Sequence, residues 1–67
     1  MAKTHQVLKV DACGKMFSVV YHSGQVNPYR IYRHTYVPSE WGYLKRKSCE
    51  VKYADMRSCM YWLAQQF

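Results

Sequence analysis

The sequence lacks the features that mark membrane-spanning proteins, secreted proteins and nucleotide-binding enzymes. No apolar run approaches the roughly 20 residues of a membrane-spanning helix, and residues 1–6 contain no apolar core of a secretory signal. The three glycines stand singly, so no glycine-rich phosphate loop is present. These absences lead us to expect a cytoplasmic protein that has no membrane partner.

Cysteine is scarce and is not spaced for pairing. Cys13, Cys49 and Cys59 cannot all pair within one chain, and no two of them form a C-x-x-C motif. We therefore predict three reduced thiols, and neither a metal nor a cofactor. A zinc site built from Cys49, Cys59 and His22 or His34 is the weaker alternative, because structural zinc ligands usually come in close pairs.

Carboxylates are also few. The chain has four aspartates and glutamates but ten lysines and arginines, which gives a net charge of +6. No two of the four are marked out for acid–base chemistry. A chain of 67 residues also has little room for a substrate pocket of several hundred cubic ångströms, so we predict that this is not an enzyme. The positive charge favours nucleic acid or another acidic partner, although small domains also carry such a charge for solubility.

Aromatic and β-branched residues are abundant instead, and they predict strands in a single small domain that spans residues 1–67. Alternating apolar positions indicate strands at about 6–12, 16–22 and 29–37, separated by turns that contain Gly14, Gly24 and Pro28. Residues 46–53 also alternate, with Cys49, Val51 and Tyr53 on one side. This pattern favours a fourth strand over its rival, a helix that begins near residue 48.

The end of the chain, at about 55–66, has helical character. Asp55 is a suitable N-cap, and no glycine or proline follows it. One apolar stripe at spacings of three and four is expected to pack on the sheet, with Trp62 at its margin; the stripe consists of Met56, Cys59, Met60, Leu63 and Phe67. The predicted fold is therefore α+β, an antiparallel meander of three or four strands with one C-terminal helix packed on one face.

The segment 28–37 concentrates the chemistry of the chain. If it is a strand, one face carries a core row of Tyr29, Ile31, Arg33, Thr35 and Val37. The opposite face then carries a basic and aromatic row of Arg30, Tyr32, His34 and Tyr36. We expect the strand to end at residue 37 and a loop to follow over 38–42, with Trp41 finding cover at the end of the sheet.

These residues suggest a nucleic-acid-binding surface on the face that the helix leaves open, because arginine binds phosphate and guanine while tyrosine stacks on bases. The candidate residues are Arg30, Tyr32, His34, Tyr36, Lys45, Arg46 and Lys47. The alternative is a protein-interaction module, including a homodimer, that uses the same face, since tyrosine and arginine are also enriched at interfaces. The simplest reading is that these side chains only stabilise the sheet by cross-strand packing. A single face shared by Arg30, Lys45, Arg46, Lys47 and Lys52 would favour nucleic acid.

The predicted layout resembles, in architecture alone, the small sheet-plus-helix DNA-binding modules at the N-termini of some phage and transposon integrases. Gly14-Lys15 before an aromatic strand and a final helix that contains Trp62 carry this likeness. The segment 38–46 and the alternating segment after it depart from that layout.

Overall fold

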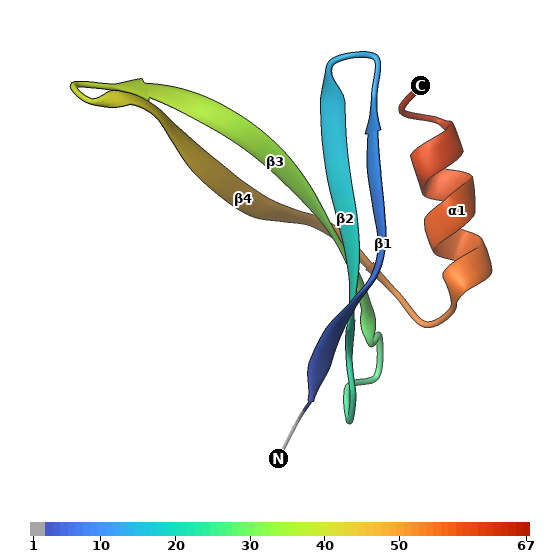
Figure 1. Ribbon diagram of the computed structural model, residues 1–67. Coiled ribbons are helices and arrows are strands. Elements are labelled where there is room, and N and C mark those ends of the chain that lie inside the picture. Colours follow the sequence, from blue (N-terminus) through green and yellow to red (C-terminus); the bar gives the residue numbers. More distant parts are fainter. Residues whose placement is uncertain (1–2) are drawn as a thin grey trace.

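The computed structural model describes residues 3–67 and shows a four-stranded antiparallel sheet with one helix (Figure 1). The strands pair in chain order, so the predicted α+β meander with a C-terminal helix is confirmed. The elements are β1 (Thr4–Ala12), β2 (Lys15–His22), β3 (Tyr29–Ser39), β4 (Gly42–Tyr53) and α1 (Met56–Ala64). Residues 46–53, for which a strand and a helix were both considered, belong to β4.

The turn between β1 and β2 consists of two residues, Cys13 and Gly14. Ala12 pairs with Lys15, and both turn residues have positive φ, 54° and 73°. Two positive φ values are typical of the type I′ turn, whose twist matches that of the flanking strands. Gly14 adopts this conformation without steric cost, whereas Cys13 carries a Cβ in a region that side chains disfavour.

The prediction of a loop over 38–42 is wrong, because β3 and β4 stay paired up to the turn that joins them. Pro38 pairs with Tyr43 and Ser39 with Gly42, so only two residues make the turn. The Ser39 hydroxyl donates to the Gly42 carbonyl (3.1 Å) and accepts from the backbone N–H of Trp41 (3.4 Å). Proline is tolerated here because β3 has only one neighbouring strand at this point, so its missing N–H interrupts no central ladder.

The strict alternation predicted for residues 46–53 is also wrong. Val51 pairs with Ile31 but Cys49 pairs with Tyr32, so Glu50 is the extra residue of a β-bulge. A bulge reverses which face the following residues occupy. Cys49 therefore lies on the face opposite α1, whereas Val51 packs against the core.

The core lies between α1 and the facing side of the sheet, and its buried apolar residues within 3–67 are Phe17, Val19, Ile31, Cys59 and Leu63. Asp55 caps the helix as predicted, because its carboxylate accepts from the Ser58 N–H at 2.8 Å. The predicted stripe is wrong at Met60, whose side chain is 51% exposed. Trp62 takes that place and packs edge-on against Phe17, with ring centroids 5.5 Å apart. The larger indole buries more apolar area than methionine, so this rotation of the helix is favoured.

β3 and β4 extend far beyond the rest of the sheet. The pairing of β2 with β3 ends at His34, while that of β3 with β4 continues to Ser39 and Gly42. Residues 35–46 therefore form a two-stranded arm, which curves away from β1, β2 and α1 (Figure 1). In the described residues, α1 is the one helix, and it is too short and too polar to cross a bilayer.

Candidate nucleic-acid interface

The strand register decides which side chains share the face opposite α1, here called the helix-free face. Directly paired residues project to the same side of a sheet. Starting from buried Ile31, whose side chain faces α1, alternation places Arg30, Tyr32, His34 and Tyr36 on the helix-free face. Their partners on β4 are Lys52, Cys49, Lys47 and Lys45. β2 contributes Met16, Ser18, Val20 and His22, and β1 contributes Lys9 and Asp11.

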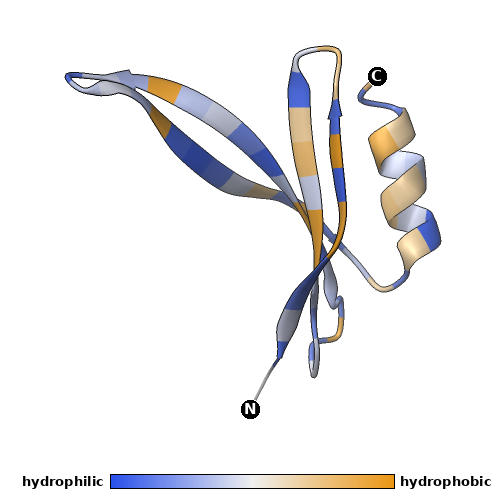
Figure 2. Cartoon of the chain, in the orientation of Figure 1, coloured by the Kyte–Doolittle hydropathy of each residue, from blue (hydrophilic) through white to orange (hydrophobic). Residues whose placement is uncertain are grey.

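Six of the seven candidate residues therefore lie on one face. The exception is Arg46, which pairs with Thr35 and projects from the other side of the arm. Of the five cations whose shared position was to favour nucleic acid, four meet that condition: Arg30, Lys45, Lys47 and Lys52. Figure 2 shows the corresponding hydrophilic stretch along the middle of β4.

The helix-free face is strongly basic because its carboxylates are almost absent. Besides those four cations it carries Lys9, whereas Asp11, at the far end of β1, is its one carboxylate among the described residues. Burial, together with Lys45, Lys47 and Lys9, holds the pKa of His34 below its ordinary value of 6.5. Burial, together with Arg30, Lys52 and Lys47 on the same face, likewise lowers the pKa of His22. Both histidines are therefore in a positive field, which an anionic partner would relieve.

The centre of the helix-free face is packed rather than open. Ser18 is 2% exposed, and its hydroxyl lies 2.8 Å from His34 Nε2. The Tyr32 hydroxyl lies 3.3 Å from His22 Nε2, and the Lys47 ammonium group lies over the Tyr32 ring, 4.9 Å from its centroid. Tyr32 therefore has a structural role, as the cross-strand-packing alternative supposes.

The exposed part of the face lies toward β4 and the arm. Lys45, Lys47 and Lys52 are exposed, and so is Tyr36, at 58%. Tyr36 is paired with Lys45, so an accessible ring and an ammonium group lie side by side. In proteins that bind single-stranded nucleic acid, such a combination is used because the cation attracts phosphate while the ring stacks on a base. Tyr36 is thus a better candidate than Tyr32 for a base contact.

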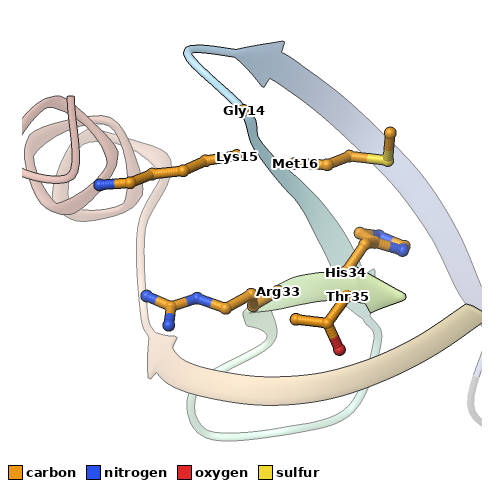
Figure 3. Close-up of a pocket in the computed structure, with 6 residues that line it drawn as sticks. All are labelled: Gly14, Lys15, Met16, Arg33, His34 and Thr35. Carbon is orange, nitrogen blue, oxygen red and sulfur yellow. The ribbon is translucent and has the colours of Figure 1, made fainter. Parts of the chain in front are cut away.

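A cleft of about 240 Å³ lies where the arm leaves the β1–β2 hairpin, and Figure 3 shows its lining. Met16 and His34 point to one side of it, while Lys15 and Arg33 point to the other. Lys15 Nζ donates to the Gln66 carbonyl (2.6 Å), and Arg33 Nε lies 3.4 Å from a Glu50 carboxylate oxygen. Both cations that line this cleft therefore already have partners within the chain.

The structure does not assemble the alternative zinc site. Cys59 is buried in the core beside α1, whereas Cys49, His22 and His34 belong to the helix-free face. Within residues 3–67, no three histidine, cysteine or acidic side chains are grouped as metal ligands. All three thiols are free, two of them exposed and Cys59 buried.

Sequence reasoning missed Lys9 and Tyr43 as members of the basic and aromatic surface. Lys9 is opposite Ser18, and Tyr43 is opposite Pro38, which is the next pair on the same face after Lys45 and Tyr36. The alternation within each strand was visible in the sequence, but only the strand pairing shows that Lys9 and Tyr43 share this face.

No protein-family model, curated protein sequence or solved structure matches this chain.

Proposed function

We propose that this protein is a small nucleic-acid-binding protein that uses the exposed edge of the helix-free face. The observation that supports this most is the pairing that groups Arg30, Lys45, Lys47 and Lys52 with Tyr36. The other features of the surface agree with it. α1 leaves this face uncovered, and among residues 3–67 the face carries five cations and one carboxylate. Such a protein would belong in the cytoplasm, where three reduced thiols are stable.

Phosphate contacts provide the affinity in this proposal. Each phosphate that a lysine neutralises releases condensed counterions, so log affinity should fall linearly with log salt concentration, by about 0.9 per contact on duplex DNA. Lys45 is the cleanest residue to change, because it is exposed and neighbours Tyr36 without covering it. Lys47 also lies on the Tyr32 ring, so its replacement alters packing as well as charge.

The test is a fluorescence anisotropy titration of duplex and single-stranded oligonucleotides at several salt concentrations. Lys45→Gln should weaken binding to every sequence and reduce the salt slope by about one. Arg57→Gln removes the same charge from exposed α1 and serves as the matched control, with the slope unchanged. Arg46→Gln tests the face assignment, because it should resemble the control more than Lys45→Gln. The proposal fails if no oligonucleotide binds at about 50 mM salt, where electrostatic binding is strong.

The alternative function, a protein-interaction module, uses the same surface. It has support from the exposed aromatic rings of the arm, since tyrosine and tryptophan are enriched at interface hot spots. Sedimentation equilibrium separates the two functions. A homodimer that Tyr36→Ala dissociates, together with weak and sequence-independent DNA binding, would favour the protein interface.

A further inference from the structure

The tip of the arm exposes more aromatic surface than any other part of the chain that the structure describes. Trp41 is 95% exposed, Tyr43 74% and Tyr36 58%. An isolated exposed ring is common, but contiguous apolar surface on a small protein usually marks a contact site. The expectation that Trp41 finds cover at the end of the sheet is therefore wrong, and its exposure needs an explanation.

The tip is held in a defined shape. The two hydrogen bonds of the Ser39 hydroxyl, to Gly42 and from Trp41, close the turn. Gly42 has φ of 116°, a conformation that residues with a side chain rarely adopt. The backbone at Trp41 is thus fixed while its indole remains in solvent, which reduces the entropy lost when a partner binds.

The rings of the arm continue the basic surface described above. Tyr43 pairs with Pro38, and the adjacent pair on the same face is Lys45 with Tyr36. The exposed rings of Tyr36 and Tyr43 are thus diagonal neighbours, and the Lys45 ammonium group lies beside them. Paired and diagonal residues of two adjacent strands are typically about 5–8 Å apart. Trp41 lies just beyond them at the turn.

We propose that the arm binds unpaired bases, with Trp41 and Tyr43 as stacking platforms and Lys45 on the phosphate backbone. This inference rests on the proposed function and names its partner as single-stranded nucleic acid. Base edges in a duplex groove are read with the most specificity by side chains that form two hydrogen bonds at once, chiefly arginine, asparagine and glutamine. The helix-free face of the arm has none of these, because its members are Tyr36, Pro38, Tyr43 and Lys45. Aromatic rings beside a cation instead match single strands, whose bases all present a flat π-face.

The experiment compares a fluorescein-labelled oligothymidine with a mixed-sequence duplex of the same length, using the full chain. The oligothymidine should bind more tightly. Trp41→Ala and Tyr43→Ala should each weaken its binding by about 5- to 150-fold, with the salt slope unchanged, because stacking releases no counterions. Trp41→Phe should retain most of the affinity, since it keeps a ring.

Tyr61→Ala is the matched control, because Tyr61 is also exposed (71%) but lies on α1, away from the arm. The Tyr61→Ala variant should bind the oligothymidine as tightly as the unchanged protein does. The difference in fluorescence between the unchanged protein and Trp41→Phe isolates the emission of Trp41. This emission should be quenched when the oligothymidine binds. Melting temperatures of all variants should agree, because the replaced side chains are exposed.

Four outcomes would overturn the inference. If Trp41→Ala behaves like Tyr61→Ala while Lys45 still controls binding, the proposed function survives and the stacking site does not. If the duplex binds at least as tightly as the oligothymidine, the arm does not select unpaired bases. A self-association that Trp41→Ala abolishes, without an effect on oligothymidine, would make the tip a contact between copies of the chain. If neither oligonucleotide binds at low salt, the inference and the proposed function fail together.

Discussion

Leu63 lies at the centre of the contact between α1 and the sheet, and its replacement by alanine should test how the helix is docked. Its side chain is 4% exposed and belongs to a core of five buried apolar residues in the part of the chain that the structure describes. Leucine-to-alanine changes in well-packed cores cost about 2–5 kcal/mol. A domain of 67 residues has a total stability of about 3–10 kcal/mol at typical values per residue. We therefore expect Leu63→Ala to lose a large share of the folding free energy.

The matched variant is Met60→Ala, one helical turn away. Met60 is 51% exposed and is not among the residues that pack on the core. Its replacement should cost less than about 1 kcal/mol, because alanine favours helix at least as well and little buried area is lost. Gln65→Ala should be nearly silent, within about 0.5 kcal/mol.

Urea denaturation, followed by far-UV circular dichroism and by tryptophan fluorescence, measures these differences. Trp62 reports on the core because it packs against Phe17. In a domain of this size each kcal/mol shifts the melting temperature by about 4–8 °C, so Leu63→Ala should melt at least about 8 °C lower. Equal losses for Met60→Ala and Leu63→Ala would refute the observed rotation of α1 and restore the stripe that the sequence predicts.

Three further predictions concern the turn, the thiols and pH. Cys13→Asn should stabilise the protein by up to about 1 kcal/mol in urea denaturation, because asparagine tolerates the positive φ of this type I′ turn better than cysteine; a loss of stability would contradict the turn assignment. In a thiol-reagent time course, Cys13 and Cys49 should react quickly and Cys59 only on unfolding, because burial raises the pKa of the Cys59 thiol and blocks access; three equal rates would contradict this. The pKa of His34 is lower in the folded protein than its ordinary value of 6.5. The unfolded chain therefore binds more protons than the folded protein just below this pH, and stability should fall as pH decreases through 6.5. A second loss should follow in stronger acid, because the Ser58 N–H bond lowers the pKa of Asp55 below its ordinary 3.8, and the stability it adds disappears as pH falls through the folded pKa. Urea midpoints across this pH range, with Asp55→Asn as comparison, would detect both steps, and a flat profile would contradict them.

The local features of this protein follow from its sequence. Alternation of apolar and polar residues reveals strands, because side chains of an extended chain point to opposite faces whatever lies beside them. The cap at Asp55 and the turn at Gly14 depend on a few adjacent residues, so short sequence patterns also indicate them. The grouping of Arg30, His34 and Tyr36 on one face is of this kind, because they belong to one uninterrupted strand.

Other features depended on contacts between distant segments, and only the tertiary structure decided them. The bulge at Glu50 arises from the pairing of β4 with β3, and it places Cys49 and Lys52 on one face although their separation in an unbroken strand would place them on opposite faces. The rotation of α1 depends on which large side chain fits against Phe17, and that contact links residues 45 positions apart in the chain. The length of the arm follows from where β2 stops pairing with β3, a property of two strands together. For this reason the sequence predicted a basic and aromatic strand, while the structure showed which cations join it and that its exposed rings lie on the arm.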